Sequence, residues 1–148
     1  MGTIDLVQHP AVRLWAISSA VVALKTLAVA GYTSSLRIRS GTFISPEDYA
    51  FQGQSAKTAP DANVERARRM HQNDLENHLP FALVGLVYAL TEPSTIGLYL
   101  CFVGFPVARI LHSFFYARAR MPHRTVAYAI GVGITAWMAL SSLASLLS

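Results

Sequence analysis

Long apolar stretches separated by short polar connections dominate the pattern of this sequence. Three of them run over Leu14–Leu36, Thr95–Tyr116 and Val126–Leu147. Crossing the hydrocarbon core of a bilayer takes about 20 residues of helix, and each stretch provides that length. The first carries a single charge, Lys25, and the last carries none. The pattern therefore predicts membrane-spanning helices.

A fourth apolar stretch, Leu79–Leu90, is too short to span a bilayer alone. It overlaps the end of the polar segment VERARRMHQNDLENHLPF, residues 64–81. It becomes a spanning helix only if that segment is also helical and other helices shield its charges, because bare charge in hydrocarbon is costly. We therefore predict an all-α fold, with a single integral-membrane domain over residues 1–148 that forms a four-transmembrane-helix bundle. The expected spans are approximately 11–36, 63–90, 95–117 and 123–147, with a cytosolic loop over 37–62.

Two other interpretations of the apolar pattern compete with this one. The first stretch could be a cleaved signal peptide, with AVAG (Ala28–Gly31) as its cleavage site, but Lys25 opposes this because a signal core is uncharged and only about 7–15 residues long. A soluble four-helix bundle would need a polar face on every helix, which the charge-free last stretch lacks. The composition also opposes it: 53% of the residues are hydrophobic and 14% are charged, whereas soluble domains carry roughly 25% charged residues.

Basic residues gather on one side of the predicted spans. They are Arg37, Arg39, Lys57, Arg66, Arg68 and Arg69 around the first long connection, and Arg118, Arg120 and Arg124 around the second. The other side shows only Arg13 near its edge, together with Glu92. Because basic residues favour the cytosolic side, both termini are expected on the lumenal or external side. The pI near 9.6 then reflects topology, and no nucleic-acid partner is expected because no binding module is present.

The longest connection, residues 40–62, is expected to be a loop. Its helix breakers are Pro46, Gly53 and Pro60. Asp61 or Asn63 is expected to cap the helix that follows. The single cysteine, Cys101, excludes a disulfide within the chain.

Polar side chains three and four positions apart share one helix face, and three predicted spans carry such a face. The members are Arg66, Arg69, Asn73, Glu76 and Pro80 in the second span, Arg109, His112 and Tyr116 in the third, and Arg124, Tyr128 and Gly131 in the fourth. All three faces lie near the expected cytosolic boundary. Together they predict a cationic, hydrogen-bonding pocket in the cytosolic half of the membrane.

An internal network of ion pairs is the alternative to a ligand pocket, with Glu65 bound to Arg69 and Glu76 bound to Arg109. The arginines of these segments outnumber the acids, however. Unneutralised positive charge inside a bundle is costly, so a bound anion is the natural complement. A metal site is not expected, because the histidines are scattered and mixed with arginines. These are His71, His78, His112 and His123.

Arg124 and Thr125 follow a proline at the start of the last predicted span. A guanidinium beside the amides of a helix N-terminus can hold a thiolate or an oxyanion. This pair is therefore a candidate for activating a thiol.

The segment VERARRMHQNDLENHLPF resembles the signature of the membrane-associated proteins in eicosanoid and glutathione metabolism, the MAPEG family. Three further segments are similar to family motifs and occur in the family's order. They are TFISPED (Thr42–Asp48), ARILHSFFY (Ala108–Tyr116) and MPHRTVAY (Met121–Tyr128). The resemblance covers nearly the whole chain.

The resemblance implies a homotrimer in the bilayer that binds glutathione between neighbouring subunits and needs no metal. It implies catalytic roles for Arg124, as the residue that stabilises the glutathione thiolate, and for Asp48 and Thr125 beside it. The positions that match glutathione contacts are Arg37, Arg68, Arg69, His71, Gln72, Asn73, Glu76, His112, Tyr116, Arg124, Thr125 and Tyr128. Glutathione carries two carboxylates, one amine and a thiol, which arginines, a glutamate and neutral donors can recognise.

The family contains several activities, and the motif favours one of them. NDLEN is similar to the microsomal glutathione transferase branch, which conjugates glutathione to hydrophobic electrophiles and reduces lipid hydroperoxides. The prostaglandin E synthase branch, the first alternative, has an arginine where Gln72 stands. Tyr49 replaces a cysteine found after PED in some transferases, which puts thiol-triggered activation there in doubt. A lipid-binding scaffold of the lipoxygenase-activating type is the non-enzyme alternative. The resemblance also implies a location in the membrane of the endoplasmic reticulum, with the mitochondrial outer membrane as the alternative.

Overall fold

The computed structural model describes residues 6, 8–55, 59 and 61–148. Within that part of the chain every regular element is a helix and no strand occurs, so the predicted all-α class is confirmed. The helices are α2 (Pro10–Ser40), α3 (Pro46–Phe51), α4 (Ala62–Leu90), α5 (Thr95–Phe102), α6 (Gly104–Ala117) and α7 (His123–Leu147). Lys57 and Pro60, which the sequence analysis used, lie outside the described residues.

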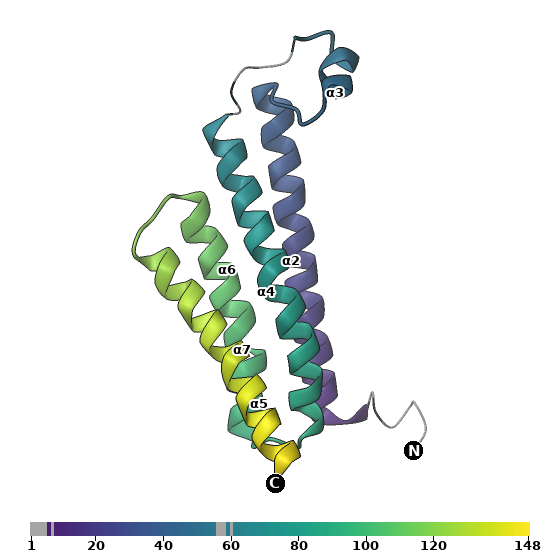
Figure 1. Ribbon diagram of the computed structural model, residues 1–148, viewed down its shortest axis with the longest axis vertical. Helices are drawn as coiled ribbons and strands as arrows, with labels where there is room; N and C mark the ends of the chain where they lie inside the picture. Colours follow the sequence, from purple (N-terminus) through teal and green to yellow (C-terminus); the bar gives the residue numbers. More distant parts are fainter. Residues whose placement is uncertain (1–5, 7, 56–58, 60) are drawn as a thin grey trace.

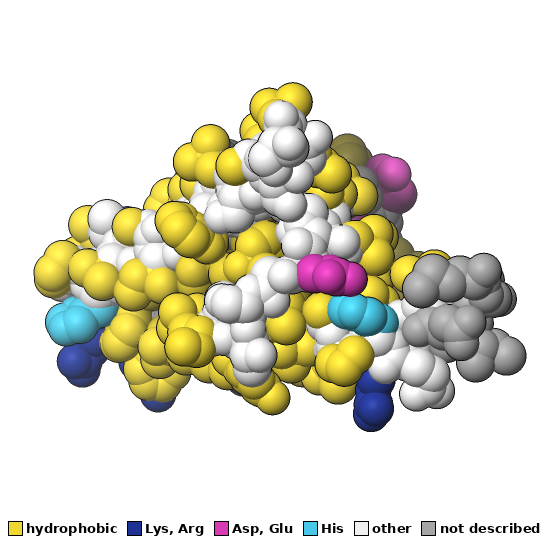
Figure 2. Space-filling model, turned by 90° about the horizontal axis from the view of Figure 1, so that it is seen from below, with side chains coloured by type: hydrophobic (Ala, Val, Ile, Leu, Met, Phe, Trp, Pro, Cys, Tyr) yellow, Lys and Arg dark blue, Asp and Glu magenta, His cyan; other side chains and the backbone are white. Residues whose placement is uncertain are grey.

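The long helices lie side by side along the long axis of the molecule (Figure 1). α2 packs against α4, α6 packs against α7, and α4 also contacts α7. α2 and α6 end, and α4 and α7 begin, at one end of the molecule, here called the loop end (Figure 1). The start of α2 at Pro10 and the end of α7 at Leu147 lie at the opposite end, here called the terminal end (Figure 1). Figure 2 shows that the terminal end is mainly hydrophobic with few charged side chains.

Three helical stretches are long and apolar enough to cross a membrane by length and composition. They are Pro10–Ser40, Thr95–Ala117 and His123–Leu147. α4 has sufficient length but is not among them, because its first half carries most of the charged residues of the polar segment 64–81.

α2 continues to Ser40, beyond the expected end of the first span at residue 36. Gly41 then ends it in the left-handed conformation, with φ of 59°, which a glycine adopts without the steric cost of a side chain. Arg37 and Arg39 occupy the last turn, where cations interact favourably with the helix dipole. Arg37 is therefore held on a helix and does not belong to the loop.

The long connection also contains a short helix, α3, where the sequence analysis expected only loop. Pro46 occupies its first turn together with Glu47 and Asp48. A proline suits the first turn because its missing N–H has no helical partner there, and acids are favoured by the helix dipole. The buried Tyr49 anchors the helix edge-on against Phe43, with ring centroids 5.2 Å apart.

α4 begins at the cap that the sequence predicts. The Asp61 carboxylate accepts hydrogen bonds from the backbone N–H groups of Asn63 at 2.8 Å and Val64 at 3.2 Å. These bonds satisfy two of the four amides that a helix start leaves free. The prediction of Asp61 as a cap is confirmed.

The third apolar stretch is interrupted at Val103, between α5 and α6. Pro106 has no N–H and so cannot donate to the carbonyl of Phe102, four residues earlier. The Ser18 hydroxyl of α2 donates a hydrogen bond to that carbonyl instead. A side chain from another helix thus satisfies the backbone group that the proline leaves free.

Aromatic side chains fill the core toward the terminal end. Phe81 and Phe105 are fully buried and stacked, with ring centroids 3.9 Å apart. Gly85 permits α2 and α4 to approach closely, since a Cβ at this position would lie 3.0 Å from Cδ1 of Trp15. The Trp15 indole donates to the Ala82 carbonyl at 2.9 Å. The loop-end half of the bundle, by contrast, contains polar side chains.

Candidate functional site

A buried ion network joins three helices in the middle of the bundle. The side chain of Asp74, on α4, has no solvent exposure. It accepts hydrogen bonds from the Lys25 ammonium of α2 and from Arg109 Nη2 of α6, the latter at 3.1 Å. Burying a charge is tolerated only with close partners of opposite sign, and this arrangement supplies two of them.

Arg109 also fixes the side chain of Asn73, a predicted glutathione contact. Its Nη2 donates to Asn73 Oδ1 at 2.6 Å. Gly131 of α7 leaves room for the arginine, because a Cβ there would lie 3.3 Å from Arg109 Cδ. The expected pairing of Arg109 with Glu76 is wrong: Asp74 lies on the buried face of α4, whereas Glu76 lies on its exposed face.

The network leaves positive charge and polar atoms without partners. Two cations share one carboxylate, so the buried group carries a net positive charge. Among the described residues, several buried side-chain atoms near the network and on α6 have no hydrogen-bond partner. They are Asp74 Oδ2, His78 Nε2, Arg109 Nε and Nη1, His112 Nε2 and Ser113 Oγ. Buried polar atoms in native proteins are usually hydrogen-bonded to protein, to ordered water or to a bound group, so these atoms can accept such partners.

Four predicted site residues meet where α6 and α7 face each other near the loop end. His112 is buried, and its ring centroid lies 5.5 Å from Tyr116 and 5.9 Å from Tyr128. The Arg124 guanidinium carbon lies 4.5 Å above the Tyr116 ring. A guanidinium within about 6 Å of an aromatic face is attracted to it, which holds Arg124 in place.

A hydrogen bond within this cluster determines which nitrogen of His112 is free. His112 Nδ1 lies 3.0 Å from the Arg124 backbone carbonyl, which can only accept a hydrogen bond. Nδ1 therefore carries the hydrogen, and in a neutral ring Nε2 is left as an acceptor. This buried acceptor can receive a hydrogen bond from a ligand donor.

The exposed face of α4 carries most of the other predicted contacts. Glu65 pairs with Arg68 at 3.3 Å and with Arg69 at 3.9 Å, so the expected Glu65–Arg69 ion pair is present. Gln72 Nε2 donates to Glu76 Oε1 at 3.0 Å. Within the described residues, no hydrogen bond or ion pair joins this face to the Arg124 cluster. His71 is half-buried on the same helix.

The remaining predicted residues are separate from the cluster or only adjacent to it. Arg37 and Asp48 line one small pocket between the end of α2 and α3. The exposed Thr125 hydroxyl points to the Met121 sulfur, 3.4 Å away. In the part of the chain that the structure describes, neither Asp48 nor Thr125 is hydrogen-bonded to Arg124.

The sequence analysis did not assign Lys25, Thr26 or His78 to the site. Thr26 Oγ1 lies 2.6 Å from His78 Nδ1, and His78 Nε2 lies 3.9 Å from Asp74 Oδ1. One signal could have found the group: Lys25 is the only charge in its apolar stretch, and an ionisable residue inside a predicted span requires a buried partner.

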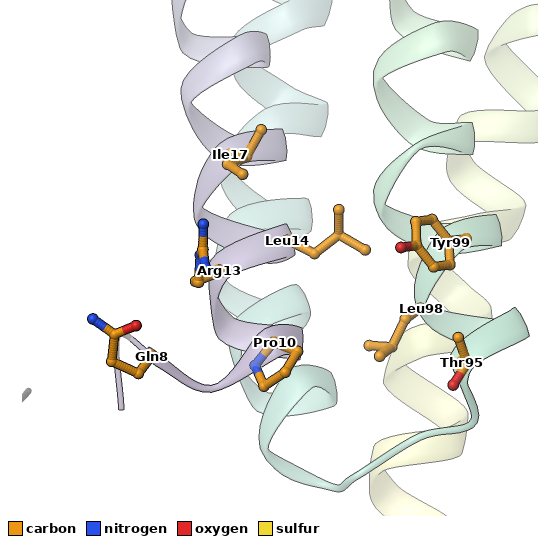
Figure 3. Close-up of a pocket in the computed structure, with 8 residues that line it drawn as sticks. All are labelled: Gln8, Pro10, Arg13, Leu14, Ile17, Thr95, Leu98 and Tyr99. Atoms are coloured by element: carbon orange, nitrogen blue, oxygen red, sulfur yellow. The ribbon is translucent and has the colours of Figure 1, made fainter. Parts of the chain in front are cut away.

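Other features of the described residues lie outside this site. No group of three or more metal-ligating side chains occurs among them. A pocket at the terminal end lies between α2 and α5 (Figure 3), and none of the predicted catalytic or glutathione-binding residues lines it. Its lining residues are Gln8, Pro10, Arg13, Leu14, Ile17, Thr95, Leu98 and Tyr99.

Helices long and apolar enough to cross a membrane, with a polar site among them, indicate an integral membrane protein. Comparison with known proteins identifies its family. The model of the MAPEG family matches residues 15–144. The chain belongs to the MAPEG family, which confirms the resemblance seen in its motifs.

Relatives of two kinds are similar to nearly the whole chain. The chain is 37% identical to mouse microsomal glutathione S-transferase 1 over 130 residues, 84% of each chain. The bovine microsomal glutathione S-transferase 1 is 36% identical over 146 residues, 95% of this chain and 94% of the relative. Human prostaglandin E synthase is 32% identical over 139 residues, 93% of this chain and 91% of the relative.

Proposed function

We propose that this protein is a glutathione-dependent membrane enzyme that conjugates glutathione to hydrophobic electrophiles and reduces lipid hydroperoxides. The observation that carries the proposal is the cluster of His112, Tyr116, Arg124 and Tyr128, in which an arginine lies beside a buried histidine with a free Nε2. The similarity to the glutathione S-transferases, up to 37% identity, supports glutathione as the co-substrate.

The residues present fit glutathione. The excess of arginine among the predicted contacts, Arg37, Arg68, Arg69 and Arg124, suits a ligand with two carboxylates. The exposed Glu76 suits the ligand's amine, and His112 Nε2 can accept from a ligand N–H. Asn73 is already oriented by Arg109, so its amide needs no rearrangement to bind.

Arg124 is assigned the central catalytic role. Its guanidinium lies at the start of α7, where the helix amides also carry partial positive charge. Both effects favour the thiolate over the thiol form of glutathione. The thiolate sulfur then bonds to the electrophilic carbon of the second substrate while the leaving group departs with its electron pair. The hydrophobic second substrate enters from the bilayer.

Four membrane crossings and a homotrimer complete the proposal. α4 exposes Arg69, Gln72 and Glu76 in a single chain, and bare charge facing lipid is costly. A neighbouring subunit that covers this face would remove the cost and enclose glutathione at the subunit boundary. The trimeric stoichiometry and the endoplasmic reticulum are carried over from the family, whereas the cytosolic location of the loop end rests on the basic residues gathered there.

Prostaglandin E synthase is the second candidate function. Its support is the similarity to the human prostaglandin E synthase, which extends over 93% of this chain. In this alternative the same thiolate would attack one endoperoxide oxygen and break the O–O bond, and the oxygen released would take up a proton. Loss of the proton from the carbon that bears the sulfur-bound oxygen, with Asp48 assisting proton transfer, would then form the ketone and release the thiolate. Gln72 stands where that branch has an arginine, which favours the transferase.

One assay tests both candidates. The purified protein in detergent is given glutathione with either 1-chloro-2,4-dinitrobenzene or prostaglandin H2. We expect conjugation to dominate and Arg124→Ala to lower its kcat by about 10²–10³-fold, the usual loss when one preorganised donor is removed. Arg39→Ala, an exposed arginine at the same end, is the control and should keep wild-type activity. Full activity of Arg124→Ala would overturn the mechanism, and dominant prostaglandin E formation would favour the second candidate.

A further inference from the structure

A shallow apolar groove runs between α6 and α7 on the outside of the molecule. Its lining comes from both helices, and only His123 among the lining residues is polar. The residues are Ala108, Leu111, Phe115, Pro122, His123, Val126, Ala127 and Ile130. None of them belongs to the proposed glutathione site.

The size of the groove points to a chain-like occupant. Its volume is about 190 Å³, below the roughly 300–1,000 Å³ of pockets for drug-sized molecules. Leu111, Val126 and Ile130 remain between 44% and 56% exposed in it. The stretch formed by α5 and α6 and the helix α7 are each long and apolar enough to cross a membrane, so a hydrocarbon chain of the bilayer is the available partner.

The groove continues into basic residues at the loop end. Ala108, Leu111 and Phe115 follow each other at helical spacings of three and four, so they lie on one stripe of α6, and Arg118 caps the end of that helix three residues further on. The Arg118 guanidinium carbon lies 3.8 Å above the Phe114 ring, which leaves its N–H groups free to bind an anion. The backbone N–H of Arg120 donates to the Phe115 carbonyl at 2.9 Å, so the turn that carries Arg120 closes onto the end of the groove.

No acid balances these basic residues. The sequence from residue 93 to 148 contains arginines but no aspartate or glutamate. Within the described chain, neither Arg118 nor Arg120 forms an ion pair, and both are exposed. An apolar groove that ends at unpaired cations is complementary to a molecule with a hydrocarbon tail and an anionic head.

We propose that the groove between α6 and α7 is a binding site for an anionic phospholipid. One acyl chain lies between Leu111 and Val126, and the phosphate and headgroup are bound by Arg118 and Arg120 at the loop end. Basic residues directly beside a membrane-spanning helix attract anionic headgroups, and basic pockets between such helices bind them specifically.

Native mass spectrometry of the delipidated full-length protein in detergent tests the site. Phosphatidylserine and phosphatidylcholine with identical acyl chains are titrated against wild type and against the double variant Arg118→Gln/Arg120→Gln. We expect wild type to prefer phosphatidylserine by about tenfold and the double variant to lose that preference, since each basic residue near the membrane surface contributes separately to the attraction. The double variant Arg13→Gln/Arg39→Gln, with the same change of charge elsewhere, should keep it.

A second variant separates the groove from the charge. Val126→Trp fills the groove at an exposed position, so it should weaken the binding of both lipids while leaving the thermal unfolding of the protein unchanged. Soluble glycerophosphoserine should compete poorly, because it lacks the acyl chain. Equal affinity for the two lipids in wild type, equal losses in the two double variants, or efficient competition by the soluble headgroup would each overturn the proposal.

Discussion

Asp74 is the single carboxylate between two buried cations, and its charge decides whether they can remain inside the bundle. The ammonium of Lys25 and the guanidinium of Arg109 both bind the same oxygen, Oδ1. Removal of one partner from a buried ion network is costly because the remaining charges lose their compensation. Arg109 in turn holds Asn73, so the network connects stability to the proposed site.

Asp74→Asn should lower the free energy of unfolding by about 3–5 kcal/mol, the usual cost of breaking a buried ion pair. Reversible unfolding in mixed micelles, followed by circular dichroism, measures it. Glu65→Gln is the matched control: the arginines that it pairs with are 62% and 61% exposed, so its loss should cost about 0–1 kcal/mol. Equal costs for the two variants would contradict a stabilising role of the network.

Glu76→Ala should mainly weaken glutathione binding, because the carboxylate is assigned to the ligand's amine and makes only one side-chain contact within the described chain, with Gln72. The loss of one charged hydrogen bond corresponds to about 1.5–3 kcal/mol, or roughly a tenfold to hundredfold rise in the KM for glutathione. Glu92→Ala, at the terminal end, serves as the control. An unchanged KM in Glu76→Ala would remove this residue from the site.

At the scale of the elements, the interruption between α5 and α6 depends on a contact from α2. Ser18→Ala removes the donor to the Phe102 carbonyl, which Pro106 leaves without a backbone partner. We expect the free energy of unfolding to fall by about 1–3 kcal/mol, the penalty for an unsatisfied buried acceptor.

The neighbouring residue provides the control for that prediction. Within the described residues, the buried Ser19 hydroxyl has no hydrogen-bond partner, so Ser19→Ala should be neutral or slightly stabilising. Thermal unfolding of the two variants in the same detergent compares them directly. Similar destabilisation by both would show that Ser18 matters for its size and not for its hydrogen bond.

Local patterns predict the elements of this fold well, and pairings across helices much less well. Asp61 as a cap follows from the chemistry of one residue and its two successors. α3 was missed because Pro46 and Gly53 were interpreted as loop residues, although a proline followed by two acids also suits a first helical turn. The alternative interpretation paired Arg109 with Glu76, whereas the structure pairs it with Asp74. A helical stripe in the sequence does not reveal which face of α4 is buried, so the sequence alone does not single out Asp74.

In the candidate site, likewise, the sequence motif names the residues, and the structure shows which of them lie close together. The motif named residues on α2, α3, α4, α6 and α7, and the structure brings four of them together, namely His112, Tyr116, Arg124 and Tyr128. Arg37 and Asp48 stay in their own pocket, and the exposed face of α4 stays apart from Arg124. A single chain does not assemble the full set, which is expected when a binding site lies between subunits.

At the scale of the whole molecule, the common location of the start of α2 and the end of α7 predicts how the chain crosses the bilayer (Figure 1). Single cysteines are introduced at Gln54, Glu92, Met121 and Ser148 in a Cys101→Ser background. In sealed vesicles, a membrane-impermeant maleimide should label the first and third from one side, and the second and fourth from the other.

The pair Gln54→Cys and Glu92→Cys tests α4 in particular, because these residues flank it. α4 is the long helix whose composition alone does not qualify it for a span. Labelling of both positions from the same side would mean that α4 does not cross. The chain would then have three crossings, and the shared location of the termini would need another explanation.

In the proposed topology, in which α4 crosses the bilayer, the ion network also implies an order of helix insertion while the chain is being made. Lys25 leaves the ribosome first, Asp74 next and Arg109 last. When α4 emerges, α2 already offers an ammonium that can neutralise the Asp74 carboxylate, so the two helices can enter the membrane as a pair that carries no net charge at its centre. Arg109 emerges after α2 and α4 have paired, and the Asp74 carboxylate is then available to accept its hydrogen bond. Inserted alone, α4 would carry an unpaired carboxylate into hydrocarbon, so the position of Lys25 makes α2 the helix on which the insertion of α4 depends.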